Sequence, residues 1–301
     1  MSEASPFRCG FIALVGRPNV GKSTLLNRLV GEKISITSQR AQTTRHRLTG
    51  VRTTPGAQLL YVDTPGMHQG QNKAVNRYMN QVARNAIHDV DLVVWLVEAG
   101  RFTDEDEAVL QALETSRVPV ILAVNKVDRI RDKAQLLPFM QSLGERLDFA
   151  AVVPLSAESG ENVEALEQEM EGRLPEGPAL FPEDQLTDAT ERFLAAEIVR
   201  EKLTRRLEQE LPYALTVAID EFREEGGQLQ IAATIWVERE SHKGIVIGRG
   251  GTVLKEVGER ARRDMERLFD NRVYLRLWAK VKENWSDDER ALKSLGYRED
   301  A

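Results

Sequence analysis

The clearest chemical motif in this sequence is an eight-residue loop near its start, residues 16–23, which lies between an apolar run and a helical pattern. Its two glycines, Gly16 and Gly21, allow successive backbone N–H groups to turn toward an anion. Lys22 can reach terminal phosphates, and the Ser23 hydroxyl can bind magnesium, so the spacing is typical of a P-loop. The residues predicted to bind phosphate here are Gly16, Arg17, Pro18, Asn19, Val20, Gly21, Lys22, Ser23 and Thr24.

Two later motifs indicate which base the nucleotide carries. Asp128, the last residue of an Asn-Lys-Val-Asp motif, can accept a pair of hydrogen bonds from the N1–H and amine of guanine, which adenine lacks. The backbone N–H of Ala157 can reach the guanine carbonyl, although Ser156-Ala157 alone fits an ordinary polar turn equally well. A dinucleotide is the competing ligand, but its glycine fingerprint is absent from the first loop. The predicted guanine-binding residues are Asn125, Lys126, Asp128, Ser156 and Ala157.

A fourth motif, Asp-Thr-Pro-Gly at residues 63–66, places the Asp63 carboxylate where it can hold magnesium through water. The Gly66 N–H can meet a γ-phosphate. Thr43 and Thr44 lie in a polar segment before this motif, and a hydroxyl there can complete the magnesium shell only when a γ-phosphate is present. We choose Thr44 over Thr43 for this role. A segment that responds to the γ-phosphate in this way is a conformational switch. The predicted magnesium ligands are Ser23, Thr44 and Asp63, and the predicted switch residues are Thr43, Thr44, Asp63, Thr64, Pro65 and Gly66.

With these four motifs in this order, the first half resembles the translation-factor-related GTPases. In Ras-like enzymes a glutamine after the motif's glycine orients the attacking water, but this sequence has Met67, whose thioether cannot do so. The expected intrinsic GTP hydrolysis is therefore slow. In families with this loop pattern, an Asn at the position of Asn19 resembles the ligand of a potassium ion. An Asn that only stabilises its own turn is the alternative.

Alternating apolar and amphipathic stretches predict the elements that position these motifs. From this alternation we predict a doubly wound, mostly parallel α/β sheet, with its ligand at the carboxyl ends of the strands. A stretch rich in proline, residues 172–188, then ends this pattern, so the predicted domains are 1–180 and 181–301, divided near Phe181. The predicted strands are residues 11–15, 48–53, 58–63, 91–97, 119–125 and 151–155, and the helices are 23–30, 73–87, 104–116, 133–146 and 162–173.

The second half has the order α-β-β-α-α-β, predicted at residues 189–210, 214–221, 229–237, a short helix ending at Ile247, 252–269 and 272–281, with a tail helix at 287–295. This α+β arrangement, with Gly-Arg-Gly-Gly at residues 248–251 between the paired helices, resembles a type II KH domain. Such domains clamp about four nucleotides of single-stranded RNA. The predicted RNA-binding residues are Lys243, Ile245, Val246, Ile247, Gly248, Arg249, Gly250, Gly251 and Lys255.

Charge and composition fit this interpretation. The net charge is -6, yet basic residues outnumber acidic ones between residues 239 and 282, which favours RNA over the alternative of a solvated, ion-paired helix face. With the single cysteine Cys9 no intramolecular disulfide is possible. No signal peptide or membrane-spanning run is present, so a cytoplasmic location is expected.

The GTPase half, the type II KH half, residues 42–46 (Gln-Thr-Thr-Arg-His) and residues 181–184 (Phe-Pro-Glu-Asp) together resemble the Era family of bacterial GTPases. The resemblance implies GTP or GDP and Mg²⁺ as cofactors, and binding to the 3′ end of small-subunit ribosomal RNA. It also implies a role in 30S ribosomal subunit assembly and rRNA maturation, and some contact with the inner membrane, for which the sequence shows no amphipathic anchor. A monomer is expected.

We further expect the switch loops, residues 32–47 and 66–76, to report the nucleotide state to the KH groove. Two alternatives stay open at this point. In the first, the chain is a GTPase that regulates a protein or membrane partner through its second domain. In the second, it is an RNA-binding scaffold whose nucleotide is structural.

Overall fold

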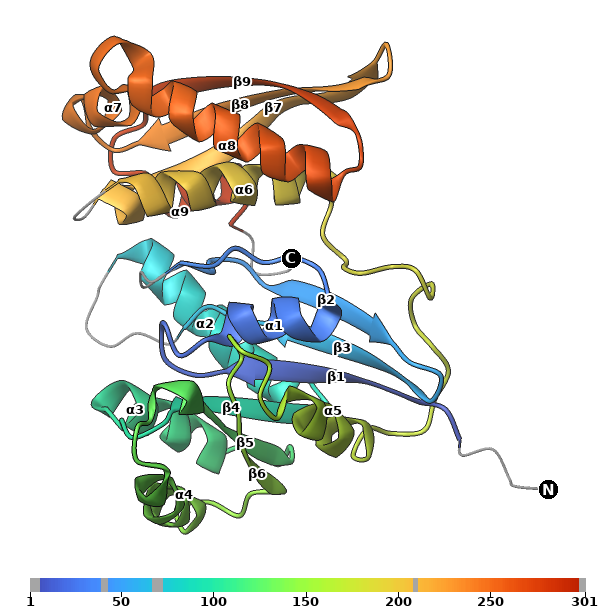
Figure 1. Cartoon of the computed structure of the whole chain (residues 1–301). Coiled ribbons are helices and arrows are strands. Elements are labelled where there is room, and N and C mark those ends of the chain that lie inside the picture. Colours follow the sequence, from blue (N-terminus) through green and yellow to red (C-terminus); the bar gives the residue numbers. More distant parts are fainter. Residues whose placement is uncertain (1–5, 39–42, 67–72, 208–210, 298–301) are drawn as a thin grey trace. The chain divides into compact units, whose positions relative to one another are not determined.

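The computed structural model describes residues 6–38, 43–66, 73–207 and 211–297. Their contacts divide the chain into two compact units, each of which has its own sheet and core (Figure 1). The first unit is Met1–Ser35, Thr44–Gln71 and Met79–Asp188, and the second is Ile36–Thr43, Asn72–Tyr78 and Ala189–Ala301.

A six-stranded sheet forms the centre of the first unit, in the order β2-β3-β1-β4-β5-β6. Every neighbouring pair is parallel except β2 with β3, which are antiparallel. The predicted doubly wound, mostly parallel sheet is therefore confirmed. The strands are β1 (Arg8–Val15), β2 (Leu48–Thr53), β3 (Ala57–Asp63), β4 (Leu92–Glu98), β5 (Val120–Asn125) and β6 (Ala151–Pro154).

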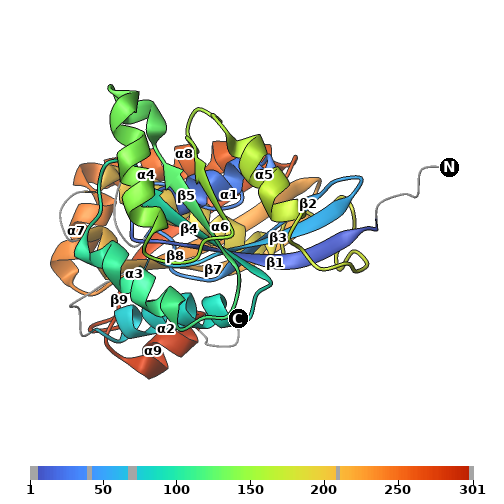
Figure 2. The same cartoon turned by 90° about the horizontal axis from the view of Figure 1, so that it is seen from below.

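Helices cover both faces of this sheet, with α1 and α5 on one side and α2 and α3 on the other (Figure 2). One core cluster joins α2, α3 and α4 to the central strands around the fully buried Trp95, whose ring stacks on Phe149. A capping box between Thr103 and Asp106 begins α3. The helices are α1 (Lys22–Val30), α2 (Ala74–His88), α3 (Asp104–Glu114), α4 (Leu136–Gly144) and α5 (Val163–Glu171), with short 3₁₀ turns at Val127–Arg129 and Lys133–Gln135.

The proline-rich stretch after α5 packs along β2. The Val51 N–H donates to Leu186 O at 2.8 Å, and the Thr49 N–H donates to the Asp188 carboxylate at 2.9 Å. These contacts are why residues up to Asp188 group with the first unit, several residues beyond the boundary expected near Phe181.

The second unit contains a three-stranded sheet in the order β7-β8-β9, with β7 antiparallel and β9 parallel to β8. Helices α6 and α8 share a core with the sheet, and the predicted α-β-β-α-α-β order is confirmed. The strand β7 continues to Glu225, four residues past its predicted end at Glu221. A bulge between Ile219 and Glu221 breaks the alternation of its side chains, which is why the sequence pattern indicated an earlier end. The elements are α6 (Glu191–Arg206), β7 (Leu215–Glu225), β8 (Gln228–Val237), α7 (Glu240–Ile247), α8 (Thr252–Leu268), β9 (Arg272–Val281) and α9 (Glu289–Ser294), with 3₁₀ turns at Leu211–Ala214 and Arg249–Gly251.

The C-terminal tail packs against one end of the second sheet. Trp285 is fully buried and its indole N–H donates to Ala214 O at 3.4 Å, while the Tyr297 hydroxyl lies 3.2 Å from the Thr216 hydroxyl. The sequence indicated a tail helix but not this packing. Among the helices that the structure describes, none has the length and apolar character needed to cross a membrane.

Trp95→Ala is expected to lower the free energy of unfolding of the first unit by about 3–5 kcal/mol, because it removes a large, fully buried ring from the core. Leu137→Ala is the matched control, since Leu137 is 62% exposed in α4. Urea unfolding followed by circular dichroism measures both. Equal stabilities of the two variants would contradict the core assignment.

Candidate nucleotide and nucleic-acid sites

The P-loop follows β1 and is tied to the guanine loop by one side chain. The Asn125 amide donates to Val20 O at 2.8 Å, and its oxygen accepts from the backbone N–H groups of Lys126 and Ala157 at 2.8 and 2.9 Å. Gly21 adopts a φ of +109°, and a Cβ there would lie 2.3 Å from the Asn125 amide nitrogen. Only glycine leaves room for this crossing, so Asn125 joins three of the four predicted motifs.

Lys22 lies inside the loop, where its ammonium donates to the carbonyls of Gly16 and Arg17 at 2.8 and 3.0 Å. Burial lowers the pKa of Lys22 to about 8, although the charge of Asp63 acts in the opposite direction. The side chain therefore keeps most of its charge at neutral pH, and it lies where a phosphate would add a counter-charge. The position agrees with its predicted role as a phosphate ligand.

The three predicted magnesium ligands converge. The Ser23 hydroxyl donates to Asp63 Oδ2 at 2.9 Å and lies 2.8 Å from the Thr44 hydroxyl, which itself lies 3.2 Å from the same carboxylate oxygen. Ser35, which the sequence analysis missed, donates to it as well at 2.9 Å. Thr43 does not join this cluster, because its hydroxyl lies 2.8 Å from that of Ser38. The geometry therefore favours Thr44 over Thr43.

The other oxygen of Asp63 tests whether a metal fits here. Asp63 Oδ1 is buried and has no hydrogen-bond partner among the described residues. Burial raises the pKa of Asp63, although the Lys22 charge and the hydroxyl donors lower it. A buried carboxylate oxygen without a partner is costly unless a cation or water satisfies it, so the donor set fits Mg²⁺. Within the described part of the chain, no group of three His, Cys, Asp or Glu side chains can hold a metal alone, and phosphate oxygens would complete the shell.

The guanine loop presents one free carboxylate. Asp128 is exposed and makes no hydrogen bond or ion pair to any described residue, so it can accept both guanine donors. Ser156 is fully buried and accepts from the Ser159 N–H at 3.1 Å. The Ala157 N–H, which we expected to face guanine, donates here to Asn125. Arg28 of α1 fixes the same loop by donating to Ala157 O at 2.7 Å.

Two carboxylates not found by sequence analysis hold Arg17. Its guanidinium donates to Glu98 and, at 3.1 Å, to Asp106, while the Lys126 ammonium lies 3.2 Å from the other Glu98 oxygen. Burial alone would raise the pKa of Glu98, but the hydrogen bond from Arg17 and the charge of Lys126 hold it below its usual value. The Arg17 side chain is therefore engaged by carboxylates, and only its backbone faces the loop interior.

Two predicted features concern hydrolysis. Asn19 adopts a left-handed conformation with a φ of 61°, is exposed, and makes no side-chain hydrogen bond to a described residue. This leaves its carbonyl oxygen available for an ion. Met67, which stands where Ras-like enzymes have a glutamine, lies outside the described residues, as does Gln42.

Two of the predicted switch residues have partners in the first unit. The Thr64 hydroxyl donates to Leu14 O at 2.9 Å, and Gly66 packs against Pro18.

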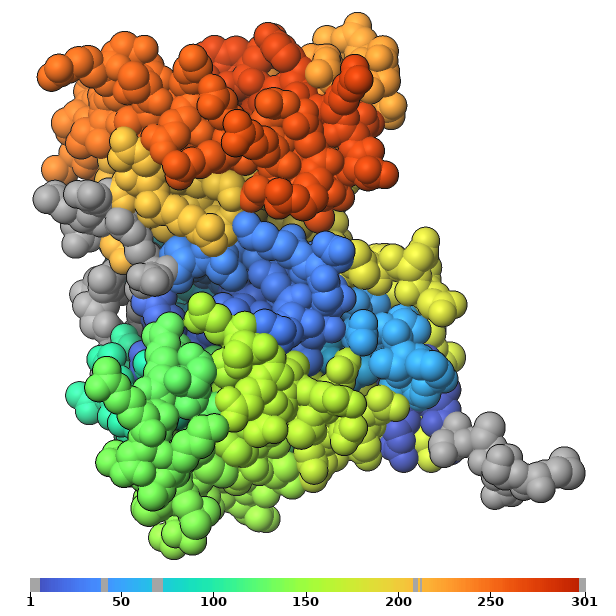
Figure 3. Space-filling view, in the orientation of Figure 1, coloured from blue at the N-terminus to red at the C-terminus, as the bar shows by residue number. Residues whose placement is uncertain are grey.

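The Gly-Arg-Gly-Gly segment lies between α7 and α8, as predicted, and the α8 side of the second unit faces the viewer in Figure 3. Gly248 has a φ of +75°, and a Cβ there would lie 2.6 Å from Val253 Cγ2. At Gly250 the space around the backbone is open. Ile245 is 55% exposed, but Val246 is fully buried in the core, so it cannot line a groove as expected.

A groove of about 410 Å³ runs from this segment between α8 and β9. Lys243 pairs with Glu240 at 2.9 Å, whereas Arg249 and Lys255 make no ion pair with a described residue. The sequence analysis did not find the part of the groove that β9 forms. Leu275 and Leu277 alternate along the strand, and such a pattern predicts only that they face the core, not that they line an open groove. The residues lining the groove are Gly251, Leu254, Lys255, Gly258, Glu259, Arg262, Leu275 and Leu277.

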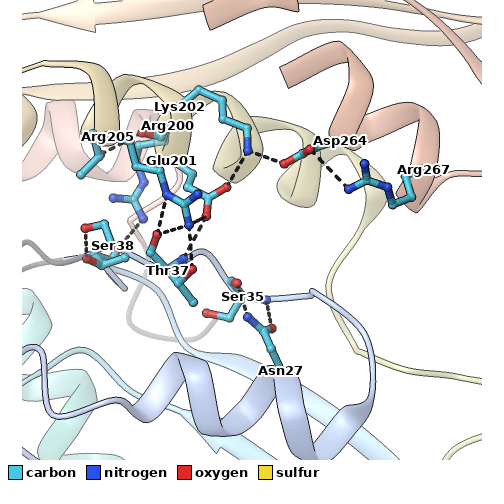
Figure 4. A network of polar contacts seen from close by, with 12 residues as sticks. Asn27, Ser35, Thr37, Ser38, Arg200, Glu201, Lys202, Arg205, Asp264 and Arg267 are labelled. Carbon is cyan, nitrogen blue, oxygen red and sulfur yellow. Dashed lines mark hydrogen bonds and ion pairs between the residues drawn. The ribbon is translucent and has the colours of Figure 1, made fainter. Parts of the chain in front are cut away.

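Part of the first predicted switch loop belongs to the second unit, where α6 contacts the described residues Thr37 and Thr43 (Figure 4). Arg205 donates to Thr37 O at 3.0 and 2.8 Å and to its hydroxyl at 2.9 Å. The Thr37 N–H donates to the buried Glu201 carboxylate at 3.2 Å, and Arg200 donates to Thr43 O. Thr43 directly precedes Thr44 of the Asp63 cluster.

The same helix turn also contacts α8. Lys202, almost fully buried, pairs with Glu201 at 3.0 Å and with Asp264 of α8. The last residues of the second predicted switch loop, from Ala74 to Asn76, form the start of α2 and also belong to the second unit. The Ala74 N–H donates to the Asp287 carboxylate at 3.0 Å and the Val75 N–H donates to Ser286 O at 3.0 Å.

Comparison with known proteins assigns both halves. A family model described as a 50S ribosome-binding GTPase matches residues 11–126, and a KH domain model matches residues 210–286. GTPase Era of Pseudomonas putida is 54% identical over 297 residues, which cover 99% of both chains. GTPase Era of Azotobacter vinelandii is 54% identical over 299 residues, covering 99% of this chain and 100% of that one.

Two solved structures match nearly the whole chain, each with a TM-score of 0.94, 37% identity and coverage of 97% of this chain and 99% of the other. One is an Era variant from Aquifex aeolicus bound to GDP and AlF4⁻. The other is Era in complex with MgGDPNP and nucleotides 1506–1542 of 16S ribosomal RNA. Identity above half over almost the full length, together with the P-loop cluster and the KH fold, shows that this chain belongs to the Era family of GTPases.

Proposed function

We propose that this chain is a GTP-hydrolysing switch that binds the 3′ end of small-subunit ribosomal RNA through its KH domain and acts in assembly of the 30S subunit and rRNA maturation. The observation that carries the switch is the convergence of Ser23, Thr44 and Asp63, with one carboxylate oxygen that has no partner among the described residues. The RNA partner is supported by the related Era structure that contains the 16S fragment.

The nucleotide site works by positioning and charge. Backbone N–H groups of the P-loop and the Lys22 ammonium would bind the phosphates, while Ser23, Thr44 and Asp63 would hold Mg²⁺. Magnesium, when bound, neutralises charge on the phosphates during hydrolysis. Because Met67 replaces the water-orienting glutamine, turnover without a partner is slow. Asn19 is the proposed ligand of a potassium ion, and its unengaged side chain supports this role.

Nucleotide state reaches the RNA groove through α6 in this proposal. With GTP and Mg²⁺ bound, Thr44 would be held at the site, and its position would act on the neighbouring residues Thr43 and Thr37, to which Arg200 and Arg205 donate. Lys202 then joins α6 to α8, which carries the groove. If GTP favours the arrangement that is open to RNA, bound RNA must favour GTP by the same free energy.

The location follows from the same proposal. A ribosome-assembly role implies a cytoplasmic protein, and a monomer is expected. A peripheral contact with the inner membrane is the remaining expectation, and vesicle co-sedimentation tests it.

Asp128→Asn is expected to weaken GDP binding at least tenfold, because each lost hydrogen bond to the charged carboxylate is worth about 1.5–3 kcal/mol. The amide N–H can instead donate to the extra carbonyl of xanthine, so xanthosine diphosphate should gain affinity. Asp148→Asn, at an exposed carboxylate that makes no hydrogen bond or ion pair with a described residue, is the control. Calorimetric titration with both nucleotides measures the change, and unchanged preference for GDP would contradict the assignment of Asp128.

Gly250→Asp is expected to weaken RNA binding at least tenfold, because it places a carboxylate where the RNA backbone approaches. The φ of +62° there strains most side chains, but Asp tolerates this left-handed region, and nothing lies within 4 Å of a Cβ, so the fold should survive. Gly226→Asp is a closely matched control, with the same φ and the same open space at the β7–β8 hairpin. Fluorescence anisotropy with a single-stranded 3′-end oligonucleotide should separate the two variants; equal affinities would refute the groove.

The proposed coupling predicts that bound RNA stimulates GTP hydrolysis. Arg205→Ala is expected to remove most of this stimulation while preserving RNA affinity, because it removes the three hydrogen bonds that Arg205 donates to Thr37 and leaves the Thr37 N–H bond to Glu201. Arg52→Ala is the control, since Arg52 of β2 is similarly exposed and pairs with Glu167 of α5 at 3.3 Å, an ion pair that involves neither α6 nor α8. Phosphate release in potassium buffer, with and without RNA, measures both. Full stimulation in Arg205→Ala would show that the coupling runs elsewhere.

A further inference from the structure

The outer face of the three-stranded sheet, on the opposite side from α6 and α8, carries an alternating row of cations and aromatic rings along β9. Because side chains alternate along a strand, the even-numbered residues of β9 share this face while Leu275 and Leu277 line the groove on the other. The row, which we call the outer β9 row, is Arg272, Tyr274, Arg276, Trp278 and Lys280.

The rings of this row are exposed to an unusual degree. Tyr274 is 50% and Trp278 43% exposed, and they are the two aromatics among the six large apolar side chains that are exposed in the described residues. They are separated by four residues of strand, or roughly 13 Å. Trp236 on β8, beside Lys280, is half-buried and continues the apolar surface toward the tail.

Charge on the row is positive. The strand β9 has three cations and no acidic residue. Arg272 and Lys280 make no ion pair with any described residue, and Arg276 pairs with Glu221 of β7. Arg276 lies 5.5 Å from the centre of the Trp278 ring, and the Lys280 ammonium lies 5.7 Å from that of Trp236. Arg272 and Lys280 each lie two residues along the same face of the strand from an exposed ring, Tyr274 and Trp278 respectively. There they can meet phosphates while a base stacks on the aromatic face.

We propose that the outer β9 row is a second binding surface for single-stranded RNA, on which bases stack on Tyr274 and Trp278 and phosphates meet Arg272 and Lys280. Exposed rings with neighbouring cations on a sheet are the arrangement by which proteins hold unpaired nucleotides with little sequence preference. Since β9 is the edge strand, a strand of RNA that leaves the groove can pass around it onto this face (Figure 1). The inference rests on the proposed RNA-binding function and extends it beyond the groove.

The test compares two labelled RNA oligonucleotides on the full chain by fluorescence anisotropy. One has the groove length of about four nucleotides, and the other carries the same sequence extended to about three times that length. In Trp278→Ala, affinity for the longer RNA should fall by roughly five- to hundredfold, the usual effect of losing one stacked base, with the short RNA unaffected. Tyr274→Ala should act alike, and Trp278→Phe should retain most of the binding.

The groove variant Gly250→Asp separates the two surfaces, because it should weaken both oligonucleotides. Circular dichroism checks the fold, although truncation of an exposed ring should change stability little. Unchanged affinity of Trp278→Ala for the longer RNA would overturn the proposal. So would a loss of self-association in that variant, seen by sedimentation, without a loss of RNA binding, because the row would then contact a second copy of the chain. If the unmodified chain binds neither RNA, the proposed function itself fails.

Discussion

The buried carboxylate of Asp63 is the constraint on which the first unit depends. One oxygen accepts hydrogen bonds from Ser23 and Ser35 and lies beside Thr44, while the other has no partner among the described residues. Burying a charge without full compensation is unfavourable, so the site is incomplete until a cation and phosphates arrive. The P-loop, the switch segment and the end of β3 meet at this one group, and a nucleotide therefore acts on all three at once.

The helix α6 extends this constraint to the second unit. Its consecutive residues Arg200, Glu201 and Lys202 are nearly fully buried and charged, which is rare unless each has a partner. Their partners are the switch segment on one side and Asp264 of α8 on the other. A buried ion-pair network adds little net stability, but removing one member leaves an uncompensated charge. Because α6 is bonded to Thr37 and Thr43 of the switch segment, a movement of that segment would disturb this network and so act on α6.

The sequence predicted the sheet types, the element order and the position of the nucleotide motifs at the ends of strands, because glycine spacing and apolar alternation are local signals. It could not find Glu98, Asp106 or Ser35, whose roles depend on contacts between elements distant in the chain. It also assigned Val246 to the groove, although this residue points into the core. The helical period around Val246 cannot tell a groove lining from a core face when both are apolar.

The measurement that tests the account most directly is the reciprocal effect of RNA on nucleotide binding. The affinities of the full chain for GDP and for a non-hydrolysable GTP analogue would be determined with and without a saturating 3′-end RNA oligonucleotide. Linkage predicts that bound RNA raises the affinity for the analogue relative to that for GDP. The factor must equal the ratio of the RNA affinities of the analogue-bound and GDP-bound chain, typically about 5–150-fold. RNA that binds tightly and leaves the ratio of the two nucleotide affinities unchanged would contradict the account, and the chain would then hold two independent modules.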